Sequence, residues 1–418
     1  MKKIVLFAVL FVAMMPLLCS AQAVKVGVEV LRDSNFKVLE GKRVGLVTNP
    51  TGIDRDFNST VDILFNAENV KLVALFGPEH GVRGNAYAGG SVEDTVDPVT
   101  GLKEYSLFGK TVKPTPEMLK DIDVLVYDIQ DNGCRSYTFI STLAMLIEAC
   151  DEQNKELVVL DRPNPLGGNR IEGSLVEDGC YSFVSQVSVP YLYGLTVGEL
   201  ANLVNEEGLV RGSKGDQKPF KCKLTVVPME GWHRDMLFAQ TGQPWVLPSP
   251  HVPSAESALY YPVSGIVGEF GFLSIGVGYT MPFQMFGAPW IKSAEFAKAL
   301  NDLNLPGIKF RALDYNPFYA VYKGENVGGV QVYITDYDAA QLTPVNFYVM
   351  ETVAKLYPDY KFFEKADKGR FRMFDIVCGS KYIRETFTKY NTFESIREYW
   401  NKDVESFRKL SSKYYLYR

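Results

Sequence analysis

Residues 71–84 of this 418-residue chain read KLVALFGPEHGVRG, an apolar run of strand length followed at once by a polar loop. The loop places Glu79, His80 and Arg83 among three glycines and a proline. A carboxylate, an imidazole and a guanidinium at the point where a buried strand ends suit a reaction site better than a core.

Three other apolar runs, at 44–48, 124–127 and 157–160, also end in polar loops, which begin at Asn49, Asp128 and Asp161. Because these runs are continuous rather than alternating, they indicate strands buried on both faces of a parallel sheet. Helical patterns separate them, at 60–66, after Thr115, at 139–154 and at 196–207. Right-handed crossovers bring the carboxyl ends of such strands to one edge, where ligands bind, so we expect the four loops to converge.

The second part of the chain has a different organisation. Residues 228–253 are rich in Pro, Gly and Trp, and we expect them to pack along a cleft wall. A second domain is predicted from 254 to 418, with helices near 293–303, 344–356 and 392–411.

The amino terminus has the charged, apolar and small-residue regions of a secretory signal peptide over residues 1–23. A lipid anchor at Cys19 is the less favoured alternative, because Leu18 is large for such a site. No later apolar run is long enough to cross a bilayer. We therefore expect a periplasmic or secreted protein without a membrane span, while the oligomeric state stays open.

Composition excludes several classes of function. The formal net charge of −5 argues against a nucleic-acid partner. The five cysteines beyond Cys19 form no C-x-x-C pair, so a disulfide scaffold or zinc knuckle is not expected and at least one thiol should be unpaired. The three histidines have no H-E-x-x-H spacing, and there is no Walker loop or G-x-S-x-G elbow. We expect neither a metal nor another cofactor.

Glu79 is the best candidate for a general acid or base. Partial desolvation at the end of the strand would raise its pKa toward neutrality, whereas His80 and Arg83 would hold it ionised, and the sequence leaves both alternatives open.

A second polar cluster, after residue 127, suits a sugar. The acidic and amide groups of Asp128, Gln130 and Asp131 suit sugar hydroxyls, and Arg135 suits an anionic substituent or an internal salt bridge with Asp131. Asp161, Arg162 and Asn164 form a similar loop made rigid by two prolines. Tyr137, Trp232 and Trp245 are candidates to stack on a sugar ring or to lie in the core.

Five ordered motifs resemble those of the NamZ-type exo-β-N-acetylmuramidases: GPEHGVRG at 77–84, YDIQDNGCR at 127–135, DRPNPLGG at 161–168, PWVLPSP at 244–250 and FGAPW at 286–290. The resemblance covers nearly the whole chain after residue 23. It implies an α/β protein with a Rossmann-like parallel-sheet domain over 24–253, a smaller α/β domain over 254–418, and an active-site cleft between them.

The resemblance also implies a reaction: cofactor-free hydrolysis of N-acetylmuramic acid from the non-reducing end of peptidoglycan fragments. Glu79 matches the glutamate of the family motif and is the expected acid, with Asp128 as first choice for the second carboxylate, followed by Asp131, Asp161 and Glu269. The lactyl carboxylate of muramic acid would find a partner in Arg83, Arg135 or Arg162.

The chain departs from the family pattern at two places. Residues 269–280 read EFGFLSIGVGYT where many members have E-G-T-N-x-S-x-G-R-G-T, and His251 stands where an asparagine is usual. We expect His251 and Glu269 to contact the substrate, and the altered loop to affect substrate preference. The changed loop also makes a catalytically silent cell-wall sugar-binding protein the main alternative, and an amidase or esterase on the same polymer a further one.

Overall fold

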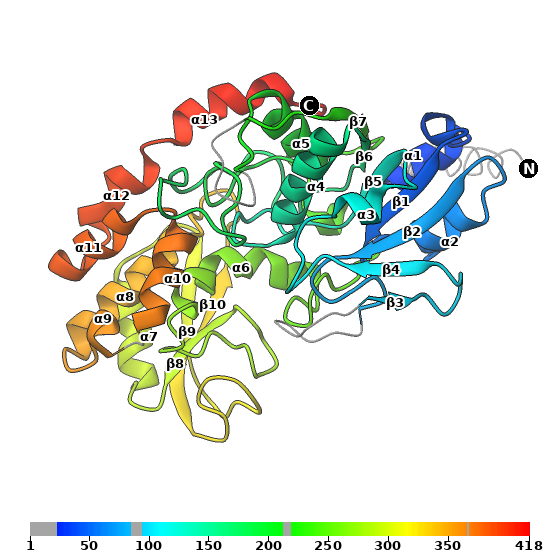
Figure 1. Cartoon of the computed structure of the whole chain (residues 1–418). Helices are drawn as coiled ribbons and strands as arrows, with labels where there is room; N and C mark the ends of the chain where they lie inside the picture. The colour runs from blue at the N-terminus through cyan, green and yellow to red at the C-terminus, as the bar shows by residue number, and fades with distance from the viewer. Residues whose placement is uncertain (1–22, 85–93, 212–218, 366–367) are drawn as a thin grey trace, which may run out of the picture.

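The computed structural model describes residues 23–84, 94–211, 219–365 and 368–418. The expected signal peptide therefore lies, apart from its last residue, outside the described residues. Figure 1 shows a larger domain that carries the long sheet and a smaller domain that carries a second sheet. The expected α/β class is confirmed.

Seven strands form the main sheet, in the order β3-β4-β2-β1-β5-β6-β7. Neighbouring strands are parallel except for the short edge strand β3, which is antiparallel to β4. The chain runs outward from β1 to β2 and β4, then returns to β5 on the other side of β1, so ligands are expected beyond the carboxyl ends of β1 and β5. The strands are β1 Arg43–Thr48, β2 Lys71–Gly77, β3 Thr95–Val96, β4 Lys103–Ser106, β5 Val124–Asp128, β6 Glu156–Leu160 and β7 Lys223–Val227.

Helices of the larger domain begin where the sequence supplies caps. The Thr196 hydroxyl accepts from the Glu199 amide (3.2 Å), and the Glu199 carboxylate accepts from the Thr196 amide (3.1 Å), which closes a capping box. The Thr115 hydroxyl caps the short helix whose first residue is proline. These helices, all expected from the sequence except α1, are α1 Gly27–Asp33, α2 Thr60–Phe65, α3 Pro116–Leu119, α4 Phe139–Gln153 and α5 Val197–Glu206.

The smaller domain packs helices against an antiparallel sheet of order β8-β10-β9. Its strands are β8 Met285–Ala288, β9 Ile308–Tyr315 and β10 Val327–Ile334. The expected helices at 293–303 and 344–356 are confirmed. Its helices are α6 Ala255–Gly268, α7 Ser293–Asp302, α8 Pro344–Leu356, α9 Phe362–Lys365, α10 Lys368–Cys378, α11 Lys381–Tyr390, α12 Glu394–Asn401 and α13 Val404–Ser411.

The single helix expected over 392–411 is wrong, because the chain forms α12 and α13 with a break at Asp403. The Asp403 carboxylate accepts from the Leu175 amide of the larger domain (3.0 Å), which ties the chain down where it turns.

The two domains share one hydrophobic core, and the carboxyl terminus returns to the larger domain (Figure 1). The Glu172 carboxylate accepts from the amides of Leu342 and Thr343 just before α8. The Tyr417 hydroxyl donates to Asp161 (2.5 Å), and the Arg418 carbonyl accepts from the Arg234 amide (3.0 Å). The domains are therefore held together by polar contacts as well as by packing.

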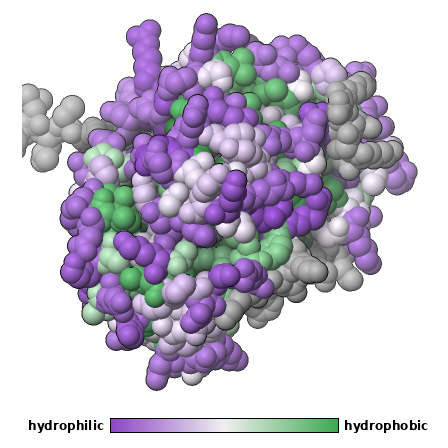
Figure 2. Space-filling view, turned by 90° about the vertical axis from the view of Figure 1, so that its left-hand side faces the viewer, coloured by the Kyte–Doolittle hydropathy of each residue, from purple (hydrophilic) through white to green (hydrophobic). Residues whose placement is uncertain are grey.

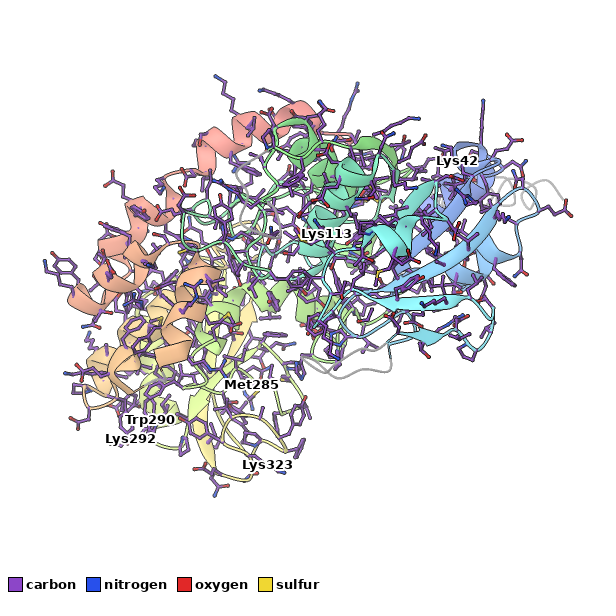
Figure 3. The ribbon with its side chains drawn as sticks, in the orientation of Figure 1. Lys42, Lys113, Met285, Trp290, Lys292 and Lys323 are labelled. Atoms are coloured by element: carbon purple, nitrogen blue, oxygen red, sulfur yellow. The ribbon has the colours of Figure 1, made fainter. Side chains whose placement is uncertain are left out.

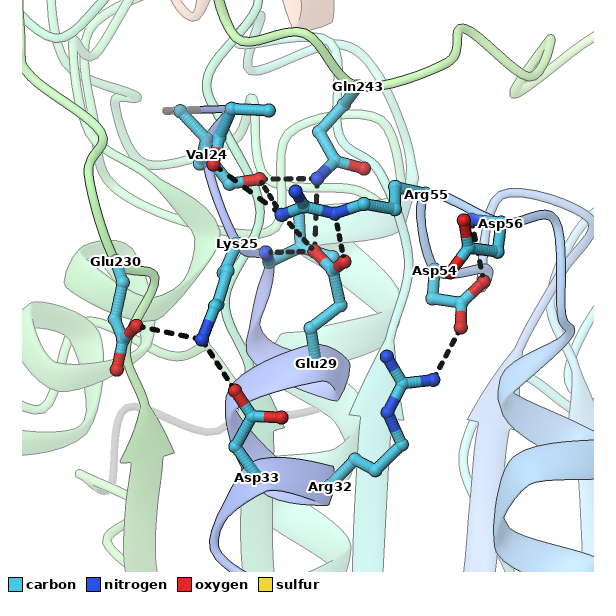
Figure 4. Close-up of polar contacts among 12 residues, drawn as sticks. Val24, Lys25, Glu29, Arg32, Asp33, Asp54, Arg55, Asp56, Glu230 and Gln243 are labelled. Atoms are coloured by element: carbon cyan, nitrogen blue, oxygen red, sulfur yellow. Dashed lines mark hydrogen bonds and ion pairs between the residues drawn. The ribbon is translucent and has the colours of Figure 1, made fainter. Parts of the chain in front are cut away.

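The segment after β1 is fixed by ion pairs around the first described residues (Figure 4). Arg55 pairs with Glu29, and Arg32 pairs with the buried Asp54 (2.6 Å). The Gln243 amide donates to the Val24 carbonyl and so joins the 228–253 segment to the same cluster. This network fixes one side of the edge at which the strand loops meet.

Further side-chain contacts stabilise each domain. In Figure 3, Lys42 and Lys113 mark the larger domain, where Lys113 pairs with Glu148 and Glu152 of α4. In the smaller domain Trp290 stacks on Tyr360, with ring centroids 4.0 Å apart. All five described cysteines are free and buried, which confirms the expected unpaired thiols.

Hydrophilic side chains cover most of the face shown in Figure 2, with hydrophobic ones in patches between them. None of the described helices is long and apolar enough to cross a membrane.

Candidate active site

Glu79 lies in a tight loop directly after β2. The Gly81 amide donates to the Pro78 carbonyl (2.9 Å), and His80 has a φ of +79°, a strained value for a residue with a side chain. The Thr138 hydroxyl donates to the half-buried Glu79 carboxylate (3.1 Å). The loop therefore turns Glu79 toward the start of α4.

Two tyrosines, one from each domain, lie close enough to Glu79 for its charge to act on them, and of these Tyr137 is buried and Tyr261 half-buried. Tyr137 and Tyr261 pack edge to face with centroids 5.6 Å apart. Burial raises the pKa of both hydroxyls, and the Glu79 charge raises both further. Because Tyr261 belongs to α6, Glu79 lies at the junction of the two domains.

Glu269 follows the end of α6 and approaches the same tyrosine. Its charge, like that of Glu79, adds to the raised pKa of Tyr261. Burial raises the pKa of Glu269 itself, and Arg370, which donates to the Glu269 backbone carbonyl (3.3 Å), opposes that rise. The charges of two carboxylates, Glu79 and Glu269, therefore both act on Tyr261.

His80 and His251 extend this group of residues. Burial lowers the pKa of His251, and the nearby charge of His80 lowers it further. The His251 ring stacks on Tyr319, with centroids 6.1 Å apart and an interplanar angle of 23°. We call the whole group the Glu79 cluster: Glu79, His80, Tyr137, Thr138, His251, Tyr261 and Glu269.

Asp128 lies at the same edge of the sheet but in a closed arrangement. It is completely buried and accepts two hydrogen bonds from Arg162, at 2.5 and 2.9 Å, and one from Thr60. Arg162 also donates to the Ile53 carbonyl (2.8 Å). The Asp128–Arg162 pair joins the loops after β1, β5 and β6, and this geometry favours a structural role for it. The catalytic role of Asp128 stays a prediction.

Asp131 and Asp161 are also held in buried hydrogen-bond networks. Asp131 accepts from the Tyr193 hydroxyl and the Gly133 amide, and burial raises its pKa to about 6. Asp161 accepts from the Thr196 hydroxyl, the Gly198 amide and Tyr417, and burial raises its pKa to about 7. Asp161 thereby fixes the start of α5 and the carboxyl terminus.

The structure does not bring Arg135 into the Glu79 cluster, which corrects its assignment to an anionic substituent. The residue is completely buried, and its guanidinium donates to the carbonyls of Ser174, Val189 and Val377 at 2.6 to 2.9 Å. The alternative salt bridge with Asp131 is likewise not formed in the described structure. Burial lowers the pKa of Arg135 to about 10.

The other predicted residues mainly order the loops. Asn49 accepts from the Thr51 amide, Gln130 donates to the Pro163 carbonyl, and Asn164 donates to the Leu195 carbonyl. Arg83 pairs with Asp97 through two hydrogen bonds, at 2.8 and 3.1 Å, and stays partly exposed.

Some buried polar atoms at this edge have no hydrogen-bond partner among the described residues. They are Asn49 Nδ2, Asp131 Oδ1 and both side-chain polar atoms of Asn132. Buried polar groups are normally satisfied by protein, water or a ligand, so these atoms are candidates to bind a water molecule or a ligand group.

Sequence reasoning missed Asn132, Thr138 and Tyr261. The first two follow predicted polar positions in the 127–138 segment and could have been included, whereas Tyr261 is in a helix without amphipathic spacing. Of the two tryptophans considered for sugar stacking, Trp232 packs on Tyr417, whereas Trp245 packs on Phe238 and donates to the carbonyl of Val252 (3.2 Å), the residue after His251.

A cavity of about 670 Å³ opens elsewhere, between the 166–171 loop, residues 234–240 and residues 337–341. It contains none of the predicted site residues, and Arg170 and Arg234 in its wall are engaged by Glu172 and Glu199. We therefore place the candidate site at the Glu79 cluster. Within the described ranges, no three histidine, cysteine or acidic side chains are grouped to hold a metal ion.

Comparisons with known proteins agree over most of the chain. Family models for the N-terminal and C-terminal domains of exo-β-N-acetylmuramidase NamZ match residues 44–256 and 259–417. A Bacillus subtilis (strain 168) protein named peptidoglycan β-N-acetylmuramidase NamZ is 43% identical over 394 residues, which cover 94% of this chain and 91% of that protein.

Two crystal structures of DUF1343 family proteins from Bacteroides fragilis NCTC 9343 have the same fold. One is 57% identical with a TM-score of 0.90, over 95% of this chain and 99% of that one. The other is 26% identical with a TM-score of 0.74, over 94% of this chain and 99% of that one.

Proposed function

This chain belongs to the NamZ family of exo-β-N-acetylmuramidases, and we propose that it releases N-acetylmuramic acid from the non-reducing end of peptidoglycan fragments, with Glu79 as general acid. The observation that carries the proposal is the position of Glu79, which is half-buried, oriented by Thr138 and located at the domain junction.

Hydrolysis of a glycosidic bond needs one carboxyl group to protonate the leaving oxygen and a second to act on the sugar or on a water molecule. We assign the second role to Glu269 rather than to Asp128. The carboxylates of Asp128 and Asp161 are engaged in buried networks, and Asp131 is engaged through Oδ2, whereas the charge of Glu269 acts on Tyr261 as that of Glu79 does. Burial partly desolvates the Glu269 carboxyl and thereby raises its pKa.

The sugar would occupy the polar edge next to these two carboxylates. The unpartnered groups of Asn49, Asp131 and Asn132 supply donors and acceptors for its hydroxyl and acetamido groups. For the lactyl carboxylate, Arg83 is the best placed of the three arginines considered, because it is partly exposed even in its pair with Asp97, whereas Arg135 and Arg162 are engaged in the interior.

The test is mass spectrometry of the products from a muramic-acid-terminated disaccharide and from the same glycan with its non-reducing end blocked. The wild type should release free N-acetylmuramic acid from the first substrate alone, and Glu79→Gln and Glu269→Gln should each slow the release at least a hundredfold. Tight binding without release would instead identify a sugar-binding protein. Freed peptide or acetate with an intact glycan would identify an amidase or esterase.

We further propose that the protein acts outside the cytoplasm, on the basis of the sequence of residues 1–23. Cell fractionation and sequencing of the mature amino terminus test this, with cleavage near Gln22 or Val24 expected.

A further inference from the structure

We propose that Phe318 and Tyr319 form an aromatic platform that binds the neutral sugar ring on the leaving-group side of the cleaved bond. This inference rests on the proposed function and adds a second subsite to it.

The platform lies in the β9–β10 loop, residues 316–326, and its two rings are open to solvent. The exposed fraction is 64% for Phe318 and 47% for Tyr319. Large adjacent aromatic side chains at the surface of a soluble protein commonly mark a binding surface. Phe318 is supported from beneath by Tyr279, with ring centroids 5.4 Å apart.

Contacts connect the platform to the proposed acid. Tyr319 stacks on His251, and the charge of His80 lowers the pKa of His251. His80 is the neighbour of Glu79 in the strained loop after β2. The platform therefore extends outward from the Glu79 cluster, on the side of the smaller domain, where a second sugar of the glycan would follow the first.

The loop is held in place by bonds to residues 269–280, the segment that departs from the family pattern. The Phe318 amide donates to the Gly278 carbonyl (2.7 Å), and the Tyr322 hydroxyl donates to the Phe272 carbonyl (2.9 Å). Gly278 has a φ of +96°, and a Cβ there would lie 2.0 Å from the Tyr319 carbonyl oxygen. Lys323, labelled in Figure 3, marks the same loop. The altered segment thus supports the platform.

The chemistry of the platform selects a sugar ring. An aromatic face offers apolar area with little conformational entropy to lose, and the C–H face of a pyranose is the apolar part of a glycan. The two platform residues carry no charge, so a neutral amino sugar fits them better than the charged stem peptide.

The experiment measures the kinetics of Phe318→Ala, Tyr319→Ala and the double variant on two substrates. One is a muramic-acid-terminated disaccharide, and the other is N-acetylmuramyl β-fluoride, whose leaving group is a single atom. The double variant should raise KM for the disaccharide at least tenfold and change kcat/KM for the fluoride less than twofold. Gly278→Ala, which displaces the Tyr319 backbone, should act in the same direction.

Phe57→Ala is the matched control, because Phe57 is an exposed aromatic residue of the larger domain. An unchanged KM for the disaccharide in the double variant would overturn the proposal, as would an effect confined to substrates that carry a stem peptide. If the wild type hydrolysed neither substrate, the proposed function itself would fail, which is a separate result.

Discussion

The substitution Asp128→Asn tests whether the Asp128 carboxylate has a structural or a catalytic role. Asp128 is completely buried and shares two hydrogen bonds with Arg162, which is itself almost completely buried. The substitution keeps the size of the side chain but removes its charge, and so leaves the Arg162 guanidinium buried without a counter-charge. Breaking a buried ion pair in this way typically costs about 3–5 kcal/mol.

We expect the lower end of this energy range, because the asparagine carbonyl can still accept one hydrogen bond from Arg162, and Arg162 keeps its bond to the Ile53 carbonyl. A loss of about 3 kcal/mol corresponds to a fall of roughly 6–12 °C in the unfolding midpoint of a domain of this size. Folded enzyme should keep its turnover to within about tenfold, since the reacting carboxylates that we propose are Glu79 and Glu269.

Calorimetry and disaccharide assays at 20 °C measure both quantities. Asp123→Asn is the matched control, because Asp123 pairs with Arg43 at the surface, where such pairs contribute about 0–1 kcal/mol. An unchanged midpoint combined with a thousandfold loss of turnover would refute the structural assignment and return Asp128 to the reaction.

Three further outcomes follow from buried groups. Arg135→Met should lower the free energy of unfolding by about 3 kcal/mol, measured in urea, because three core carbonyls lose their donor. Because burial raises the pKa of Glu269 and Arg370 opposes the rise, activity should fall on the acid side at a higher pH than for an ordinary glutamate. Arg370→Gln should shift the acid limb of the kcat/KM profile to a still higher pH, while Arg372→Gln should leave that limb at the wild-type pH. Asp161 has a pKa raised from 3.8 to about 7, so its protonated form stabilises the fold fully below about pH 4, and this contribution is lost as pH rises through 7. Urea unfolding from pH 4 to 8 should show that loss in the wild type relative to Asp161→Asn, and parallel curves would contradict it.

The larger domain could be predicted from the sequence because its local signals agree with its tertiary environment. Strands buried on both faces give uninterrupted apolar runs, and the cap residues Thr115 and Thr196 mark helix starts without help from distant contacts. The smaller domain offered weaker signals. Helix α6 is buried on most of its surface and contains Pro262, so it shows no clear amphipathic period. The break before α13 depends on Asp403 binding the amide of Leu175, a contact that no local pattern reveals.

The same distinction applies to the candidate site. Parallel-strand topology was enough to bring Glu79 and Asp128 to one edge of the sheet, but it could not show which charges are neutralised internally. Arg135 and Asp161 have the residue types of a binding site, yet their partners are backbone carbonyls and a tyrosine 256 positions away. Tyr261 enters the Glu79 cluster only through the docking of the second domain, which is a long-range packing event.

The proposed role of Glu79 as proton donor is tested most directly by comparing how much activity Glu79→Gln loses on substrates with different leaving groups. Glu79→Gln should lower kcat/KM for the disaccharide by roughly 10²–10⁴-fold, since the sugar oxygen must be protonated as it leaves. The same variant should hydrolyse N-acetylmuramyl β-fluoride within about tenfold of the wild-type rate, because fluoride departs with far less need of a proton. Equal losses on both substrates, or no loss on the disaccharide, would contradict the account.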